Sequence, residues 1–194
     1  MPANTPQRLI VAISGASGAI YGITALKMLK LLNIESHLVV SKAAALSLSA
    51  ETDLSLSELN GLADHVHRIG DIGATIASGS FRTLGMLVAP CSIKTLSEIA
   101  TGVTSNLISR ASDVTLKERR RLVLMVRESP LHLGHLKTMA AVTEMGAIVA
   151  PPMPAFYTRP NSLQDMVDQS VGRALDLFGL DAPVQRWAGL KGDE

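Results

Sequence analysis

The sequence predicts an α/β domain with a doubly wound, mostly parallel sheet and helices on both faces. Short apolar runs rich in β-branched residues alternate with longer segments of helical periodicity. The apolar runs are almost continuously hydrophobic, as expected for strands buried on both faces. The 194 residues are 47% hydrophobic and 18% charged, which suits a continuous core. The expected arrangement is a flavodoxin-like (Rossmann-like) sheet, with residues 1–194 forming a single domain.

The elements of this fold can be followed along the chain. The five clearest strands lie at 9–13, 36–40, 85–89, 122–126 and 147–150. Helical periodicity extends over 20–32, 133–145 and 162–178. Gly146 and Gly179 follow the second and third of these helices, where glycine commonly ends a helix. The most loop-like regions are the Gly-, Ala- and Ser-rich stretch 70–80 and the proline-rich stretch 151–160.

The charge composition provides no overall attraction to nucleic acid or anionic lipid. Eighteen Lys and Arg residues against seventeen Asp and Glu residues leave a net charge of +1. Any bound anion must therefore be held by a local cluster. The apolar runs are shorter than the about 20 residues that a membrane-spanning helix needs, so no membrane span is expected.

Three features predict a cytoplasmic protein that forms a homo-oligomer. Cys91 is the single cysteine, which fits a reducing compartment. The polar residues 1–7 lack the pattern of a secretion signal. High hydrophobicity with sparse charge indicates apolar surface buried between subunits. We expect the C-terminal helix and tail, about 161–194, to pack on neighbouring subunits.

Small and hydroxyl-bearing residues follow three of the predicted strands, where open α/β sheets bind their ligands. The three segments are Ser14-Gly-Ala-Ser-Gly-Ala19, Ser41-Lys42 and Pro90-Cys-Ser-Ile-Lys-Thr95. Their hydroxyls and free backbone N–H groups predict a site for a mononucleotide phosphate and a ribityl chain. Taken singly, each segment is equally explained by a tight turn or by helix capping. The spacing does not match a dinucleotide-binding fingerprint.

A second group of candidate residues is basic. It comprises Arg110, Lys117, Arg119, Arg120, Arg121, Arg127, Arg159 and Arg173. Most such charges are simply solvated. Arg110 and Lys117, however, are seven residues apart, so one face of a helix can present both. These cations could hold a phosphate without a metal ion.

The cysteine and the histidines are better explained by structure than by chemistry. Cys91 has no identifiable His and Asn/Asp partners, so we assign it to the core and give it no catalytic role. His132 and His135 share a helical face, and His65 and His67 share a strand face. Neither pair has a clear third ligand in the sequence, so no metal site is expected.

Six segments follow one another along nearly the whole chain: SGASGAIYG at 14–22, ETD at 51–53, PCSIKTL at 90–96, LKERR at 116–120, VRE at 126–128 and AFY at 155–157. Together they closely resemble the UbiX-type flavin prenyltransferases. The resemblance implies transfer of a dimethylallyl group from dimethylallyl monophosphate to N5 and C6 of reduced FMN, without a metal. The prenylated FMN would then serve a UbiD-type decarboxylase. Members of this family assemble as dodecamers with sites at subunit junctions.

The resemblance also implies roles for individual residues. The expected FMN contacts are Gly15, Ala16, Ser17, Ser41, Ser92, Ile93, Lys94, Thr95 and Arg127. The expected contacts to the allylic phosphate are Arg110, Lys117, Tyr157 and Arg173. Ser17, Glu51 and Glu128 fall on positions associated with proton handling, although the step that each serves stays open. Positive charge and hydrogen-bond donors around a departing phosphate would assist ionisation of the allylic C–O bond.

Two positions depart from the family pattern, and other functions stay open. Some members have Trp near Ile72, and many have Pro where Arg121 stands. Phe81, Tyr157 and Trp187 are the candidates to line a prenyl pocket. The main alternative function is an FMN-dependent cysteine decarboxylase of the related fold, which would leave Lys117, Arg127, Tyr157 and Arg173 unexplained. A direct aromatic-acid decarboxylase and a non-catalytic FMN carrier fit less well.

Overall fold

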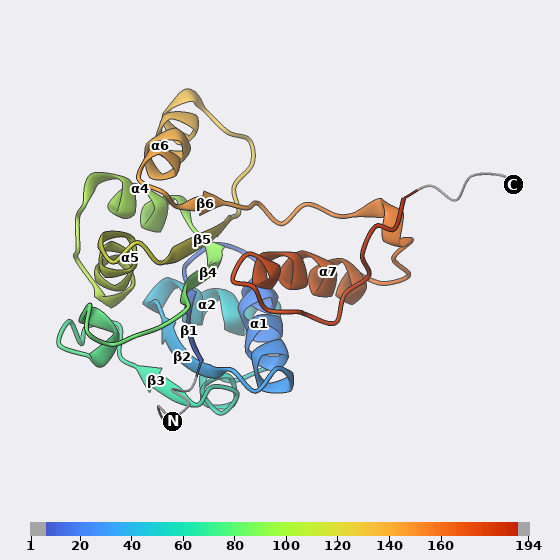
Figure 1. Cartoon of the computed structure of the whole chain (residues 1–194), viewed down its shortest axis with the longest axis horizontal. Coiled ribbons are helices and arrows are strands. Elements are labelled where there is room, and N and C mark those ends of the chain that lie inside the picture. The colour runs from blue at the N-terminus through green and yellow to red at the C-terminus, as the bar shows by residue number, and fades with distance from the viewer. Residues whose placement is uncertain (1–6, 190–194) are drawn as a thin grey trace, which may run out of the picture.

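The computed structural model describes residues 7–189 and contains one six-stranded sheet (Figure 1). The strands are β1 (Arg8–Ile13), β2 (Glu35–Val40), β3 (His65–His67), β4 (Gly85–Cys91), β5 (Arg121–Val126) and β6 (Ile148–Val149). They are hydrogen-bonded in the order β3-β2-β1-β4-β5-β6, and every pairing is parallel. The predicted fold class is confirmed. The terminal segments 1–6 and 190–194, which include the start of the chain and the end of the predicted subunit-packing tail, lie outside the described residues.

Each face of the sheet carries its own hydrophobic core, because successive side chains of a strand point to opposite faces. Leu9, Val11 and Ile13 of β1 belong to one buried cluster, whereas Ile10 and Ala12 belong to the other. All seven residues of β4 are buried, as are five of the six in β5. Burial on both faces explains why the strand sequences are nearly continuous runs of apolar residues.

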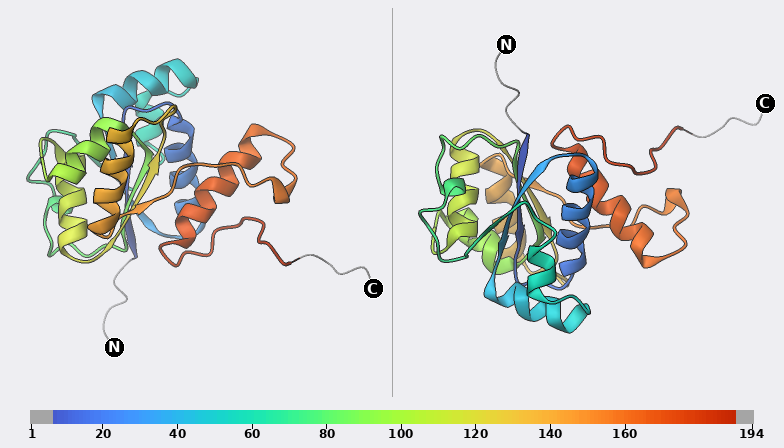
Figure 2. Two further views of the ribbon diagram at one scale, coloured as in Figure 1. Left: turned by 90° about the horizontal axis from the view of Figure 1, so that it is seen from above. Right: turned by 90° about the horizontal axis from the view of Figure 1, so that it is seen from below.

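Helices cover both faces of the sheet (Figure 2). They are α1 (Ala19–Leu31), α2 (Lys42–Glu51), α3 (Leu56–Asn60), α4 (Ile93–Thr101), α5 (Leu107–Lys117), α6 (Leu133–Glu144) and α7 (Leu163–Asp176). Helices α1 and α7 contribute to one core, and α4, α5 and α6 contribute to the other. Two short 3-10 turns lie at Thr75–Ala77 and Phe156–Thr158. Among residues 7–189, no helix combines the length and the apolar character needed to cross a lipid bilayer.

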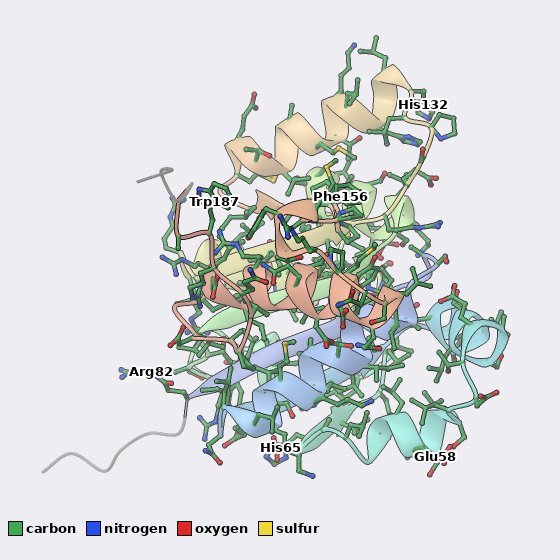
Figure 3. The ribbon with its side chains drawn as sticks, turned by 90° about the vertical axis from the view of Figure 1, so that its right-hand side faces the viewer. Glu58, His65, Arg82, His132, Phe156 and Trp187 are labelled. Carbon is green, nitrogen blue, oxygen red and sulfur yellow. The ribbon has the colours of Figure 1, made fainter. Side chains whose placement is uncertain are left out.

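The C-terminal part of the chain forms an arm that leaves the sheet after β6 (Figure 1). The arm runs outward through Phe156–Thr158 and returns as α7, which packs on α1. Its apolar side chains are unusually open to solvent: Met153 is 73% exposed and Leu163 is 80% exposed. Phe156 and Trp187 are also exposed and lie on the side of the molecule from which the arm projects (Figure 3). Exposed apolar surface of this kind is typical of protein–protein contacts.

Candidate active site

A well-formed cavity lies at the carboxyl edge of the sheet, and five strand ends contribute to it. Gly15 follows β1, Ser41 follows β2, Ile69 and Gly70 follow β3, Ser92 follows β4, and Glu128 follows β5. The cavity has a volume of about 620 Å³, within the about 300–1,000 Å³ typical of small-molecule sites. Its position beside the reversal of strand order at β1 and β4 is where open α/β sheets bind ligands.

Hydrogen bonds connect the two loops at the reversal. The Ser14 hydroxyl donates to the carbonyl oxygen of Pro90 (3.0 Å) and accepts from the backbone N–H of Ser92 (2.7 Å). Ser14 is almost completely buried, so these bonds are shielded from water. The loop after β1 and the start of α4 are therefore held in a fixed relation before any ligand arrives.

Two helix N-termini face the cavity. Ser41 caps α2 by accepting from the N–H of Ala44 (3.0 Å), and Ser92 caps α4 by accepting from the N–H of Thr95 (3.3 Å). Both capping residues line the cavity, as do Lys94 and Thr95. Ser41 and Ser92 can thus cap their helices and also face a bound ligand. The positive ends of two helix dipoles give the cavity an electrostatic preference for an anion.

Gly15 is required by the close approach of its loop to α2. A Cβ atom at this position would lie 2.4 Å from the Cβ of Ala43, which is far too short for two carbon atoms. The absence of a side chain lets the loop pass directly over the first turn of α2. This contact brings the ends of β1 and β2 together on one side of the cavity.

The side chain of Glu51 caps the N-terminus of helix α1. Its Oε2 atom accepts hydrogen bonds from the N–H groups of Gly18 (2.8 Å) and Ala19 (3.1 Å). Partial burial alone would raise the pKa of Glu51, but bonds from Gly18, Ser17 and Ala19, with the positive charge of Arg127, lower it below its ordinary value. The loop expected to cradle an anion therefore already holds a carboxylate at Gly18 and Ala19.

The expected FMN contacts fall into two adjoining groups. Those that line the cavity are Gly15, Ser41, Ser92, Ile93, Lys94 and Thr95, with the proton-handling candidate Glu128. Ser17 and Arg127 instead lie beside Glu51, where both act on its carboxylate. Ala16 is in the same loop after β1. The two groups share this loop, so they form one continuous region at the edge of the sheet.

The expected phosphate contacts lie outside this cavity in a single chain. Lys117 is the last residue of α5, whereas Asn106, which caps the other end of α5, lines the cavity. Eleven helical residues span about 16 Å, so Lys117 lies far along the helix from the cavity. It pairs with Glu118 (2.6 Å), and Arg110 pairs with Asp113 (2.9 Å).

Tyr157 and Arg173 come together on the C-terminal arm. With Arg186 and Trp187 they line a small hollow of about 250 Å³. The Tyr157 hydroxyl accepts from Gln169 (3.2 Å), and the Tyr157 and Trp187 rings lie edge to face, with centroids 5.5 Å apart. Asp176 forms ion pairs with both Arg173 and Arg186. The expected phosphate contacts Tyr157 and Arg173 therefore lie in one hollow with Trp187, which with Tyr157 was expected to line the prenyl pocket.

Phe81, a candidate to line the prenyl pocket, does not line this cavity within one chain. The Phe81 ring packs edge to face on His37, with centroids 5.0 Å apart, and under the guanidinium of Arg8 at 4.8 Å. Arg8 begins β1, whereas the cavity lies beyond the end of this strand. Phe81 is therefore at the opposite edge of the sheet.

Several residues around the cavity were not predicted from the sequence. They are Ala43, Ile69, Gly70, Ser105, Asn106 and Ile108. Ile69 and Gly70 were missed because His65 and His67 were considered only as a pair on one strand face, and the residues after them were not searched for ligand contacts. Asn106 had a usable signal: Asn followed three residues later by Ser forms a capping box at the start of α5.

Cys91 is fully buried at the end of β4, and burial raises the pKa of its thiol to about 12. A thiol with so high a pKa is protonated at neutral pH and is a poor nucleophile. The assignment of Cys91 to the core is supported by this environment.

Comparison with known proteins identifies the family. The family model described as Flavoprotein matches residues 2–174. The flavin prenyltransferase UbiX of Escherichia coli K12 is 57% identical over 187 residues, covering 94% of this chain and 99% of that protein. The crystal structure of AnUbiX in complex with FMN and dimethylallyl pyrophosphate superposes with a TM-score of 0.94 at 52% identity, covering 96% of this chain and all of the other.

Two further structures bear on assembly and on the alternative function. A dodecameric FMN-dependent UbiX-like decarboxylase from Escherichia coli O157:H7 has a TM-score of 0.91 at 48% identity, covering 94% of this chain and all of the other. The FMN-dependent cysteine decarboxylase TvaF has a TM-score of 0.62 at 15% identity, covering 75% of this chain and 90% of the other, and this likeness concerns the fold alone. The chain belongs to the flavoprotein family and, within it, to the UbiX flavin prenyltransferases.

Proposed function

We propose that this protein transfers a dimethylallyl group from dimethylallyl monophosphate to N5 and C6 of reduced FMN. The observation that carries the proposal is the cavity at the carboxyl edge of five parallel strands, with two capped helix N-termini facing it. The family membership of the chain supports the same activity. The product, prenylated FMN, would be passed to a UbiD-type decarboxylase.

FMN, the prenyl acceptor, would be held by the cavity and the loop after β1. The residues proposed to contact it are Gly15, Ala16, Ser17, Ser41, Ser92, Ile93, Lys94, Thr95 and Arg127. The N-termini of α2 and α4 suit an anionic phosphate, and the hydroxyls of Ser41, Ser92 and Thr95 suit a ribityl chain. Ser17, Glu51 and Glu128 are the candidates for moving protons at the flavin. The hydrogen bonds to Glu51 keep its carboxylate ionised and oriented.

The allylic phosphate would be held by Arg110, Lys117, Tyr157 and Arg173. The guanidinium groups of the arginines and the ammonium group of the lysine can neutralise the negative charge that develops on a departing phosphate. In other prenyl transfers a metal ion plays this role. The exposed groups of the C-terminal arm already combine cationic side chains with aromatic rings. We propose that Tyr157 and Trp187 lie beside the prenyl group and that no metal is required for the transfer.

The complete site would be assembled from more than one chain. Within one chain, the length of α5 separates Lys117 from the cavity, and Tyr157 and Arg173 line a different hollow. A neighbouring subunit would supply these groups to the flavin cavity. We propose a homododecamer, as described for the UbiX-like protein of Escherichia coli O157:H7. We also expect a cytoplasmic location, since the chain has a single, buried cysteine.

The direct test is anaerobic incubation of the purified protein with reduced FMN and dimethylallyl monophosphate, with and without a chelator. Mass analysis of the released flavin is expected to show the addition of one dimethylallyl unit in both conditions. Unchanged flavin in every condition would reject the proposal. A product that forms only without the chelator would reject metal independence.

Decarboxylation is tested by the same preparation with other substrates. Release of carbon dioxide from a cysteinyl peptide, with unchanged flavin in the prenylation assay, would favour the cysteine decarboxylase. Release from an aromatic acid without any partner enzyme would favour a direct decarboxylase. We expect neither reaction.

A further inference from the structure

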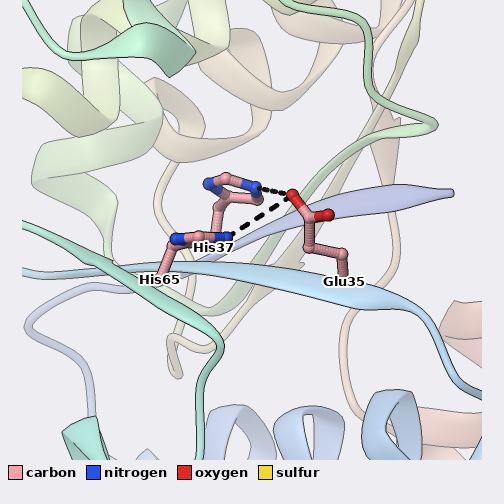
Figure 4. Close-up of side chains that lie close together, drawn as sticks. All are labelled: Glu35, His37 and His65. Carbon is pink, nitrogen blue, oxygen red and sulfur yellow. Dashed lines mark hydrogen bonds and ion pairs between the residues drawn. The ribbon is translucent and has the colours of Figure 1, made fainter. Parts of the chain in front are cut away.

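A cluster of imidazole and carboxylate groups lies on β2 and β3, at the edge of the sheet. Glu35 and His37 are on β2, and His65 is the register partner of His37 on β3. Alternate residues of a strand share a face, so all three side chains lie on the same side of the sheet. Their ligand atoms lie within 4.8 Å of one another, and both imidazoles contact the same carboxylate oxygen of Glu35 (Figure 4).

We propose that Glu35, His37 and His65 form a binding site for a divalent transition-metal ion of the zinc class. Two imidazole nitrogens and a carboxylate oxygen are ligands that zinc accepts, and a water molecule can complete such a site. The site would serve the structure of the sheet edge. It is separate from the prenyl transfer, which needs no metal.

The spacing of the ligand atoms supports the proposal. Ligands about 2.0–2.1 Å from a tetrahedral metal ion lie about 3.3 Å from one another. The Oε1 atom of Glu35 is 2.9 Å from Nε2 of His37 and 3.6 Å from Nε2 of His65. These two distances lie on either side of the required value. The His37 and His65 rings are stacked, with centroids 4.6 Å apart, so the exposed His65 ring must rotate to point its nitrogen at a shared ion.

His37 also has the second hydrogen bond that metal-binding histidines characteristically make. Its Nδ1 atom lies 3.0 Å from Nε2 of His67, and the two rings are stacked. When a metal takes Nε2 of His37, the Nδ1–H group can donate to His67 and fix the ring orientation. His67 is therefore a positioning residue of the proposed site.

The burial of His37 and the solvent exposure of His65 both suit a metal-binding site. The His37 side chain is only 4% exposed and is packed under Phe81, whereas the His65 side chain is 55% exposed. Glu35 and His65 also border a surface hollow of about 430 Å³. One ligand is thus held rigidly in the fold, and the ion can enter from solvent on the opposite side.

Arg8 is the group that opposes cation binding. Its Nε atom donates to the same Oε1 atom of Glu35 at 2.7 Å. A metal ion must share this carboxylate with the guanidinium or use the other oxygen. Removal of the Arg8 charge is therefore expected to tighten metal binding, which a purely structural hydrogen-bond network would not do.

The proposed ion would join the edge strand to the rest of the sheet. Strand β3 has three residues and pairs only with β2 in the described sheet. Ile69 and Gly70, which line the flavin cavity, follow directly after it. A metal bridge between His37 and His65 would fix the strand from which this wall of the cavity extends.

The test is zinc titration of the full-length, tag-free protein, followed by calorimetry and metal analysis. We expect about one zinc ion per chain for the wild type. His65→Ala is expected to abolish this uptake, and His67→Ala is expected to weaken it about 10- to 100-fold. Arg8→Gln is expected to bind zinc several-fold more tightly.

The matched control is the other histidine cluster. All five histidines of the chain fall into two groups, and His132 lies at the opposite end of the molecule from His65 (Figure 3). The rings of His132 and His135 are also close, at 3.6 Å between centroids. His132→Ala should leave the uptake unchanged. Each variant is checked for folding by circular dichroism and for FMN binding.

The proposal is overturned if the wild type takes up no zinc in micromolar solution. It is also overturned if a folded His65→Ala protein binds zinc as the wild type does, or if His132→Ala removes the uptake. Weaker zinc binding by Arg8→Gln would contradict the proposed competition at Glu35.

Discussion

Glu51 is the last residue of helix α2, and its carboxylate caps the start of helix α1, so a single side chain connects α2 to the loop after β1. The N-cap residue of α1 is Gly18, which has no side chain to accept a hydrogen bond, and Glu51 supplies the missing acceptor from another element. The same carboxylate is the proposed site of proton handling at the flavin. Substitution of Glu51 should therefore affect stability as well as activity.

The stability effect of Glu51 has a defined pH dependence. The pKa of Glu51 is lower in the folded chain than its ordinary 4.5, so the ionised group stabilises the fold above this pH and loses the effect as the pH falls through the lowered pKa. Glu51→Gln should reduce the free energy of unfolding by about 0.5–1 kcal/mol at neutral pH, as loss of a cap does. Urea unfolding at several pH values should show this difference disappearing in acid.

The control for this experiment is Glu144→Gln, which removes the same charge at the end of α6. A gap between wild type and Glu51→Gln that grows as the pH falls below 4.5 would contradict the account of Glu51.

Arg173 is the most informative single residue for the chemistry. It lies in the last turn of α7 and shares a hollow with Tyr157 and Trp187. If it grips the leaving phosphate, Arg173→Ala should slow prenyl transfer about a hundredfold while FMN binding stays normal. Single-turnover formation of prenylated flavin measures the rate, and flavin fluorescence measures the binding.

Arg159→Ala is the comparison for Arg173, because Arg159 is an exposed arginine on the same arm. Equal rates for Arg173→Ala and the wild type would remove Arg173 from the site. A lysine at position 173 should restore part of the rate, since it keeps the charge but loses the bidentate geometry.

At the scale of elements, the sequence was most informative where burial is complete. The strands β1, β2, β4 and β5 are long and apolar, and each lies within a residue or two of its predicted position. Strand β3 was not among the five clearest predicted strands, because it has three residues, two of them histidines, and lies at an exposed edge. Ile69 and Gly70 were lost from the predicted site for the same reason.

The close approach of α1 to the sheet gives a prediction for an element. Gly22 is buried in α1, and a Cβ atom there would lie 2.5 Å from Ile13 Cδ1 and 2.6 Å from the carbonyl oxygen of Ala89. Gly22→Ala should therefore destabilise the protein by about 1–3 kcal/mol. Its higher helix propensity, worth about 1 kcal/mol, would not offset the clash.

Denaturant unfolding measures the effect of Gly22→Ala, with Gly61→Ala as the control. A Cβ atom at Gly61 has its nearest neighbour at 3.4 Å, an ordinary contact, and the backbone there is right-handed. Gly61→Ala should be neutral or slightly stabilising. A Gly22→Ala protein as stable as the wild type would show that α1 can move away from the sheet.

At the scale of the whole molecule, the proposed site is divided between two regions of the chain. The flavin cavity could be anticipated from the strand ends, because parallel strands bring their carboxyl ends to one edge. The location of Lys117, Tyr157 and Arg173 could not, because it depends on the direction of α5 and on the course of the arm. Phe81 lies away from the cavity of its own chain, at the end of the sheet where β1 begins, and its position in a loop gave no indication of this.

The measurement that tests this account most directly is complementation between two inactive variants. Glu128→Gln alters a residue that lines the cavity proposed to hold FMN, and Lys117→Ala removes one of the proposed phosphate contacts. Each variant alone should form little prenylated flavin. If two chains build each site, unfolding, mixing and refolding equal amounts should restore about one quarter of the wild-type rate, since one combination in four has both halves intact. Mixed protein that assembles normally but stays as inactive as its parents would contradict a site shared between subunits.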